Sequence, residues 1–208
     1  MAMAQADHSP FRSPEQKLRD RTAKRNALLL AAARMFNARG FHAASLDDVA
    51  ASVGVTKPTI YHYLGNKEQV LIECMTIGLN QLQDAAASAR TEAGTGMDRL
   101  RRFLEEYAQV NMAEFGQCVI RTGDELLSPE GLEKLRALKR PIDTAMRTFI
   151  DEGISDGSIA PHDTKLLAFT LAGALNWPAR WYISDSPLDS REIAVRMVKI
   201  LMEGFAPR

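Results

Sequence analysis

The apolar residues of this chain recur at the spacing of an α-helix. The first long example falls at positions i, i+3, i+4 and i+7, which are Leu29, Ala32, Ala33 and Phe36. Residues three and four apart share one helix face, so this stripe predicts a helix over 18–39. Gly40 follows it, at the place where a glycine often ends a helix. No segment alternates apolar and polar positions with β-branched residues, so we expect no strands.

Two short helices and several longer ones are predicted after Gly40. The first short helix begins at Ser45 or Leu46 and ends near Val53. Gly54 breaks the pattern, and Thr56 is suited to cap the second short helix, which runs to about residue 63. The longer predicted helices cover 66–90, 97–115, 128–138, 141–156, 163–183 and 190–205.

This order of helices predicts an all-α fold in three segments. Residues 1–17 are expected to form a flexible N-terminal arm. Residues 18–66 form a head of three helices with a helix-turn-helix, and 67–208 form a larger helical body for ligand binding and dimerisation. Asp163 and Ser190 are candidate N-caps for the last two helices of that body.

The composition is that of an ordinary globular protein. The chain has 208 residues, of which 46% are hydrophobic and 25% charged. Two cysteines are too few for a disulfide scaffold, which favours a reduced, cytoplasmic location. No apolar run approaches the roughly 20 residues that a membrane helix needs, and the N-terminus has no secretory signal, so no membrane partner is expected.

Charge is distributed unevenly along a chain whose formal net charge is zero. Residues 1–68 hold ten Lys and Arg against six Asp and Glu, and the remainder carries the opposite excess. A basic end on an acidic remainder suggests contact with a polyanion. The densest basic cluster comprises Lys17, Arg19, Arg21, Lys24 and Arg25. The alternative for this cluster is the solvated start of a helix.

Residues 45–63 have the arrangement of a helix-turn-helix, whose second helix can enter the major groove of DNA. We expect four apolar side chains to pack on the first helix: Val49, Val53, Val55 and Ile60. The second helix is then left with a polar and aromatic face formed by Thr56, Lys57, Thr59, Tyr61, His62 and Tyr63. The alternative is an ordinary helical hairpin with an exposed polar face.

Residues 41–71 closely resemble the DNA-binding signature of TetR-type transcriptional regulators. The matching positions are Gly40, Phe41, Thr56, Pro58, Thr59, Ile60, Tyr61, Tyr63, Asn66, Lys67 and Leu71. The family often has Phe where Leu64 stands. The resemblance implies a homodimer whose two reading heads bind a palindromic operator on double-stranded DNA.

The resemblance also implies roles for individual residues of the head. Thr56, Lys57 and Thr59 would contact base edges or phosphates at the start of the reading helix. Tyr61 and Tyr63 match positions that contact the sugar-phosphate backbone or thymine methyl groups.

The resemblance implies further roles for residues in and around that helix. Lys67 matches a phosphate-binding lysine that opens the fourth helix. Ser45 matches a position that caps the preceding short helix and can donate to a phosphate. His62 would face either DNA or solvent. Arg21 and Arg25 could reach the DNA backbone from the first helix.

The last two predicted helices are candidates for a dimer interface. The helix over 163–183 is apolar nearly all round, which indicates burial on several sides. The helix over 190–205 has an apolar stripe at Ile193, Met197, Ile200 and Leu201. Two such helices per subunit can form a four-helix interface. The alternative is that they complete a monomeric core.

The segment from Asn176 to Tyr182 is the most unusual part of the body. Pro178 should kink or end the helix, and Trp177 and Trp181 share a face. Asn176 beside two indoles could line a ligand cavity, and the alternative is aromatic packing in the core or dimer. This segment resembles a TetR subgroup that governs lipid or acyl-CoA catabolism and releases DNA when an acyl-CoA binds. Its usual Arg-Pro is replaced here by Ile183-Ser184.

Other candidate ligand residues lie earlier in the body: Phe103, Tyr107, Arg121 and Phe149. Arg121 could pair with an anionic group of a ligand or with the neighbouring Asp124 or Glu125.

No pattern of a catalytic site is evident. The chain has no glycine-rich phosphate loop, no G-x-S-x-G and no pair of histidines four apart. We therefore expect a regulator rather than an enzyme, with no cofactor and no metal. The effector would be a small hydrophobic or acyl-CoA-type molecule. Two alternatives remain, namely a DNA-binding regulator controlled by a protein partner and a helical carrier or enzyme with a vestigial head.

Overall fold

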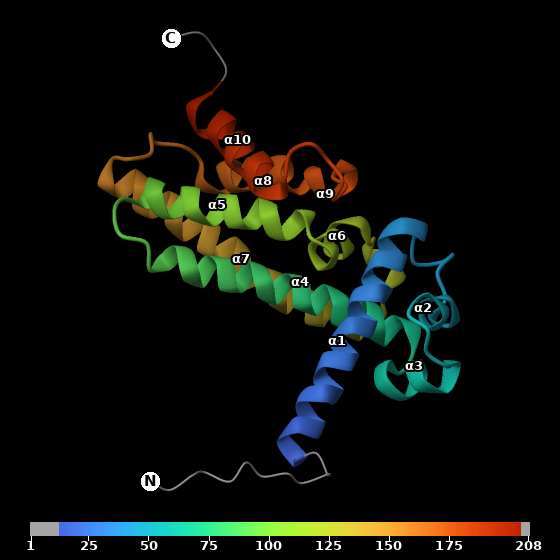
Figure 1. The fold of residues 1–208 in the computed structure, drawn as a ribbon. Helices are drawn as coiled ribbons and strands as arrows, with labels where there is room; N and C mark the ends of the chain where they lie inside the picture. The colour runs from blue at the N-terminus through green and yellow to red at the C-terminus, as the bar shows by residue number, and fades with distance from the viewer. Residues whose placement is uncertain (1–12, 205–208) are drawn as a thin grey trace, which may run out of the picture.

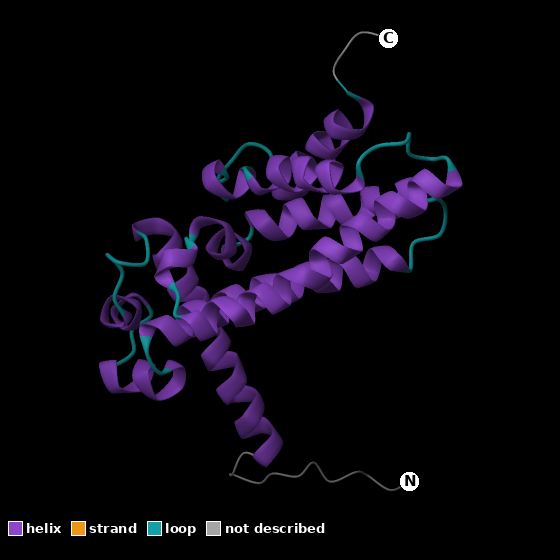
Figure 2. Cartoon of the chain, turned by 180° about the vertical axis from the view of Figure 1, so that it is seen from behind, coloured by secondary structure: helices purple, strands orange, loops and turns teal. Residues whose placement is uncertain are grey.

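The computed structural model describes residues 13–204, and in them the chain is helical without a strand. Three helices build the head: α1 (Pro14–Arg39), α2 (Leu46–Ser52) and α3 (Lys57–Leu64). The body follows with α4 (Lys67–Arg90), α5 (Gly96–Met112), α6 (Glu114–Arg121), the 3-10 turn η1 (Asp124–Leu126), α7 (Pro129–Asp156), α8 (Thr164–Asn176), α9 (Pro178–Trp181) and α10 (Ser190–Glu203). Figure 1 shows the head at one end of α4 and the α8–α10 layer at the far side of α5, and Figure 2 shows the same helices from behind.

The first helix begins four residues earlier than its apolar stripe predicts. Ser13 accepts a hydrogen bond from the backbone of Gln16, and the Gln16 side chain accepts one from the backbone of Ser13. This reciprocal cap, with Pro14 in the first turn, satisfies N–H groups that would otherwise lack a partner. Residues 14–17, expected in the arm, are therefore helical, and residues 1–12 lie outside the described part.

The helix predicted over 97–115 is interrupted. Ala113 is extended, with φ −77° and ψ 161°, and α6 starts immediately after it. The chain turns sharply here because Gly116 has no side chain: a Cβ at this position would lie 1.9 Å from the carbonyl oxygen of Val110. The apolar pattern runs through this bend and did not reveal it.

The two helices predicted over 128–138 and 141–156 are one continuous helix, α7, with Pro141 inside it. A proline ring removes one N–H and so leaves the carbonyl of Ala137 without its helical donor. Ala137 and Pro141 are both exposed, so water can take that place. The Gln83 side chain of α4 donates to the next carbonyl, Leu138, at 2.9 Å. Hydration of Ala137 and the hydrogen bond from Gln83 both lower the free-energy cost of a proline inside the helix.

The predicted helix over 163–183 ends at Asn176, and the short α9 follows from Pro178. This is the break that the proline predicts. Asp163 caps α8 as expected, accepting from the backbone of Leu166. The cap of α10 is Asp189 rather than Ser190, and its side chain accepts from the backbone of Glu192.

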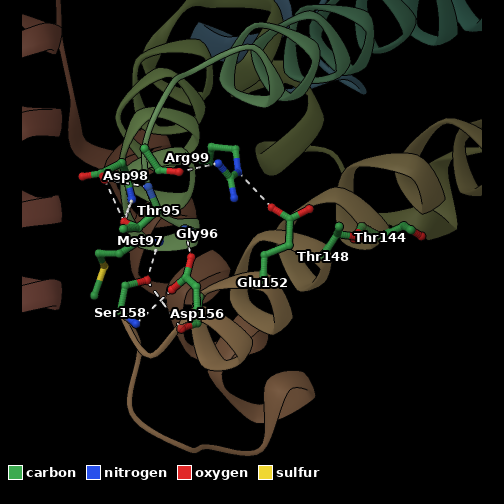
Figure 3. Close-up of polar contacts among 12 residues, drawn as sticks. Thr95, Gly96, Met97, Asp98, Arg99, Thr144, Thr148, Glu152, Asp156 and Ser158 are labelled. Carbon is green, nitrogen blue, oxygen red and sulfur yellow. Dashed lines mark hydrogen bonds and ion pairs between the residues drawn. The ribbon is translucent and has the colours of Figure 1, made fainter.

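The core of the body lies where α4, α5 and α7 pack together, and close backbone contact fixes its far end. A Cβ on Gly96 would lie 2.1 Å from the backbone nitrogen of Gly153. Figure 3 shows the start of α5 held there: Asp156 accepts from the backbone of Gly96 at 2.6 Å, and Ser158 from that of Met97 at 3.1 Å. This clamp makes α5 and α7 a rigid frame for the other helices.

Candidate nucleic-acid interface and ligand cavity

The reading helix α3 is held by apolar contacts on one side only. Ile60 is fully buried, Leu64 is nearly so, and Val49 of α2 lies against the same core. Val55 is half-buried, so the prediction that it packs on the first helix is only partly confirmed. Val53 was expected in this core and is 40% exposed instead. Because α2 ends at Ser52, Val53 leaves the helical path and its side chain no longer follows the buried stripe.

The opposite face of α3 carries exposed polar and aromatic groups. Lys57, Tyr61 and His62 are exposed, with half of the Tyr61 surface open, whereas Thr59 and Tyr63 are half-buried. A helix whose exposed side chains are of this kind can enter the major groove of DNA, which is wide enough for an α-helix.

Contacts within the head orient the first turn of α3. Thr56 occupies the N-cap position, but its hydroxyl makes no cap hydrogen bond and lies 2.8 Å from that of Thr59. Lys57 donates to Asp47 of α2 at 2.5 Å, and this bond raises the pKa of the lysine. The ammonium therefore stays charged at the exposed edge of the helix.

The start of α4 presents a cation beside α3. The Lys67 ammonium lies 4.4 Å from the centre of the Phe41 ring and donates to the carbonyl of His42 at 3.3 Å. Asn66 caps this helix in a reciprocal pair with Gln69. Ser45 caps α2, as expected, by accepting from the backbone of Asp48. These contacts place two predicted phosphate-binding residues at helix N-termini, where anions are favoured.

Arg25 was expected to reach DNA and is occupied within the protein. Its Nε donates to the carbonyl of Tyr63 at 3.2 Å, and its guanidinium is paired with Glu73 of α4. The bidentate pair fixes α1 against α4 and leaves this arginine unavailable to a phosphate. Arg21, one turn earlier, is exposed.

The body contains a cavity of about 270 Å³ between α4, α5, α7 and α8. Its walls are mainly apolar, including Leu79, Leu82, Ile142, Met146, Phe169 and Ala172. Lys139 and Asp143 of α7 are its charged lining residues.

A buried polar cluster closes one side of this cavity. The Asn176 side-chain oxygen accepts from the Tyr107 hydroxyl at 2.8 Å and from the Asn111 amide at 3.0 Å. Burial raises the pKa of Tyr107, so the phenol remains a donor. The Asn176 amide nitrogen has no partner among the described residues and is available to a group within the cavity.

The other predicted ligand residues lie elsewhere. Phe103 and Phe149 are fully buried in the core and do not line this cavity. Their ring centres are 5.8 Å apart, which is a packing contact. Trp177 and Trp181 are 62% and 46% exposed and do not line it.

Arg121 is held by backbone carbonyl groups at the end of α1 and in α9. It donates to the carbonyls of Asn37 at 2.9 Å and Ala179 at 2.7 Å, and more weakly to that of Arg180. It therefore joins the end of α1 to α9. It also lines a cleft of about 550 Å³ at this junction. Of the predicted ligand residues, Tyr107 and Asn176 are the two that line the cavity between α4, α5, α7 and α8.

The sequence analysis missed Asn111 and Lys139. Asn111 follows Tyr107 by one helical turn and is fully buried, so a lone amide on an apolar stripe was the available signal. Lys139 carries no comparable signal, because it was placed in a break between two helices.

Several large apolar side chains on the outer sides of α8 and α10 are exposed. Leu166 and Phe169 of α8 are 67% and 55% exposed, and Ile200 of α10 is 54% exposed. Helices α8, α9 and α10, which carry these side chains and the two exposed tryptophans, lie on the side of α5 away from α4 (Figure 1). Large exposed apolar surfaces of this kind usually mark an interaction site. In residues 13–204 no helix has the length and hydropathy to cross a membrane.

Two family models match the chain. The model described as bacterial regulatory proteins of the tetR family matches residues 28–74, and the model described as the tetracyclin repressor-like C-terminal domain matches residues 93–205. The first covers the head from the middle of α1 to α4, and the second covers most of the body.

Similar curated proteins span nearly the whole chain. A transcriptional activator, FasR from Mycolicibacterium smegmatis, is 25% identical over 89% of this chain and 84% of its own length. A transcriptional repressor, KstR2 from the same species, is 25% identical over 88% of this chain and 91% of its own length.

Solved structures of similar proteins share the fold. PfmR, a TetR family regulator from Thermus thermophilus, has a TM-score of 0.78 at 29% identity, covering 86% of this chain and 99% of that one. AibR in complex with isovaleryl coenzyme A and operator DNA has a TM-score of 0.75 at 25% identity, covering 88% and 100%.

Proposed function

The chain belongs to the TetR family of bacterial transcriptional regulators, and from this premise we propose that it is a dimeric repressor that an acyl-CoA-type effector releases from a palindromic operator. It is a DNA-binding regulator and not an enzyme. We place the DNA-binding domain at residues 18–66 and the ligand-binding and dimerisation domain at 67–208.

The exposed face of α3 is the observation that carries DNA recognition. We propose that Thr56, Lys57, Thr59 and Tyr61 contact base edges or phosphates in the major groove. Lys57 and Tyr61 are exposed, and Thr59 lies between them on the same short helix. Tyr63, His62, Ser45 and Lys67 would contact the backbone around this helix. Lys67 and Ser45 are suited to that role because each lies at a helix N-terminus.

The uncovered faces of α8 and α10 support a dimer. Leu166, Phe169 and Ile200 would leave water on contact with a second copy, and each buried side chain of this size is worth about 1.5–3 kcal/mol. A symmetric dimer would hold two reading helices about 34–36 Å apart, one turn of DNA.

The cavity supports a small effector rather than control by a protein partner alone. Its volume of about 270 Å³ lies near the lower end for ligand pockets and suits an acyl chain of modest length. A coenzyme A group would then lie outside it. The free amide of Asn176 can donate to a thioester carbonyl, and apolar walls can take the chain. The related AibR was crystallised with an acyl coenzyme A and operator DNA, which favours the same ligand class here.

The proposal is tested by fluorescence anisotropy with DNA from the protein's own upstream region. Acyl-CoA thioesters from acetyl- to decanoyl-coenzyme A are then added in turn. We expect one of them to release the DNA. Asn176→Leu should need at least about tenfold more thioester, because the donor to the ligand is lost and the Tyr107 and Asn111 groups that hold this side of the cavity lose their acceptor. Its affinity for DNA without thioester, measured first, shows whether the variant keeps the fold.

The matched control is Asn80→Leu, the same change on the exposed side of α4, which should leave the response unchanged. DNA binding that no thioester alters would exclude this effector class and favour a regulator controlled by a protein partner. Absence of sequence-selective binding would contradict the DNA-binding role itself.

A further inference from the structure

The short helix α6 holds the end of the head's first helix at both of its own ends. The Asn37 side chain of α1 donates to the carbonyl of Glu114, the first residue of α6, at 2.8 Å. The Asn37 carbonyl accepts from the guanidinium of Arg121, the last residue of α6, at 2.9 Å. The last turn of α1 therefore follows the position of α6 closely.

The same arginine also holds α9. Its Nε donates to the carbonyl of Ala179 at 2.7 Å, and Arg180 of α9 donates back to the carbonyl of Ile120 in α6 at 3.3 Å. Ala179 is fully buried. Figure 1 shows α6 between the end of α1 and α9. A planar guanidinium holds its donors in a fixed fork, so Arg121 fixes the carbonyls of Asn37 and Ala179 relative to each other.

A hinge separates α9 from the helix before it. Pro178 has no N–H and so leaves the carbonyl of Ala174 without its helical donor, and α8 ends at Asn176. The hydrogen bond that closes α9 is local, from the N–H of Tyr182 to the carbonyl of Pro178 at 2.8 Å. The short helix can therefore turn as a unit about residue 177 without disrupting α8.

The cavity in the body lies directly beside this hinge. Asn176, the last residue of α8, lines the cavity and is held there by Tyr107 and Asn111. It precedes Pro178, the first residue of α9, by two positions. A ligand that binds better when Asn176 is displaced shifts the protein toward that conformation, and the shift reaches the hinge at once.

We propose that Arg121 is the positioning residue through which an effector in the cavity acts on the head. Displacement of α9 by a ligand at Asn176 moves Arg121, and with it the last turn of α1, so the head leaves the position that fits the operator. This inference rests on the proposed function and names the residue that connects its two sites. It predicts that Arg121 determines the coupling between effector and operator rather than the affinity for either alone.

The test measures this coupling by anisotropy on the full chain, with the upstream duplex and each thioester from acetyl- to decanoyl-coenzyme A. In the wild type, the releasing thioester should lower operator affinity roughly 5- to 150-fold. Arg121→Gln should bind duplex and thioester separately within about threefold of the wild type, while the thioester changes its operator affinity by less than about threefold. A purely structural role would instead weaken both affinities and leave the coupling unchanged.

Arg34→Gln is the matched control, because it breaks the pair with Glu114 between α1 and α6 and leaves the bonds of Arg121 in place. It should keep the wild-type coupling. Wild-type coupling in Arg121→Gln overturns the proposal while leaving the DNA-binding function in place. An equal loss in Arg34→Gln also overturns it, because any weakening between α1 and α6 would then have the same effect.

Hydrogen exchange of the wild type tests the same route without a variant. The releasing thioester should change the exchange rate of the Tyr182 amide, which closes α9, and of the Gly40 amide, which closes α1 by donating to Phe36. A change at Gly40 without one at Tyr182 overturns the proposal. If no thioester releases the DNA, the proposed effector class has failed, and this inference with it.

Discussion

The head and the body use their helices in opposite ways. In the head, the short helix α3 packs with Ile60, and the residues proposed to contact DNA, such as Lys57 and Tyr61, are exposed and close in sequence. In the body, the residues proposed to contact a ligand line a cavity, and Tyr107 and Asn176 meet across 69 positions of sequence. A surface site can therefore be read from local spacing, whereas a cavity depends on how distant helices pack.

The largest effect that this comparison predicts is on the body's core. Phe103→Ala should lower the free energy of unfolding by about 3–5 kcal/mol, because it leaves a cavity beside Phe149. Urea unfolding followed by far-UV circular dichroism measures this. Leu18→Ala, on the exposed half of α1, should change it by less than about 0.5 kcal/mol. Unchanged stability with weaker effector binding would instead make Phe103 a ligand residue.

A smaller effect is expected at the DNA face. Tyr61→Ala should weaken operator binding by about 1–3 kcal/mol, or roughly 5- to 150-fold, while leaving the thermal unfolding midpoint nearly unchanged. The unfolding midpoint should hardly change because half of the Tyr61 surface is already open to solvent in the folded protein. Tyr61→Phe removes only the hydroxyl and so separates its contribution to operator affinity from that of the ring. Unaltered operator affinity in Tyr61→Ala would contradict the assignment of this face to DNA.

The third effect concerns Arg121, which joins the end of α1 in the head to α9 in the body. Arg121→Gln should cost about 1 kcal/mol, since the carbonyls of Asn37 and Ala179 lose a charged donor. Hydrogen exchange should become faster at the end of α1 and in α9. Arg34→Gln breaks the exposed pair with Glu114 between α1 and α6 and should alter exchange much less. Equal exchange in both variants would show that Arg121 does not connect head and body.

The smallest effect is a pH dependence in the body's frame. Hydrogen bonds from Ser158 and from the backbone of Gly96 hold the pKa of Asp156 below its usual value. A lowered folded-state pKa stabilises the fold above the unfolded value of about 3.9, and this stabilisation is lost as pH falls through the folded-state pKa.

This effect is measured by plotting the free energy of unfolding against pH, where its acid limb is the fall at low pH. Asp156→Asn should flatten that limb below about pH 4. Asp84→Asn, on the exposed side of α4, is the matched control and should retain the wild-type limb. An acid limb in Asp156→Asn as steep as that of the wild type would exclude the α5 clamp as its source.

Local signals predicted most helix positions but not every junction. The cap at Asp163 and the break at Pro178 follow from single residues. The bend at Ala113 was not predicted, because it depends on the close packing of Gly116 against the backbone of Val110. The proline inside α7 was not predicted either, because Gln83 of another helix donates to the carbonyl of Leu138 beside it. Propensity describes a segment alone, and tertiary contacts override it at such places.

The candidate sites divide in the same way. The residues of α3 were named together because they are nearly consecutive, and Lys57, Tyr61 and His62 are exposed in the structure. Trp177 and Trp181 were named as ligand residues because they stand beside Asn176, with packing in the core or the dimer as the alternative, and both are exposed in this structure. Aromatic side chains serve cores, interfaces and pockets alike, so their type does not distinguish these roles.

The most direct test of the central claim is whether the purified protein selects a sequence. Anisotropy at fixed salt compares a duplex from its own upstream region with a scrambled duplex of the same length and composition. We predict at least about a thousandfold preference for the upstream duplex, as specific regulators show, with an even number of protomers on each duplex. Equal affinity for the two duplexes, with the same salt dependence, would contradict the account.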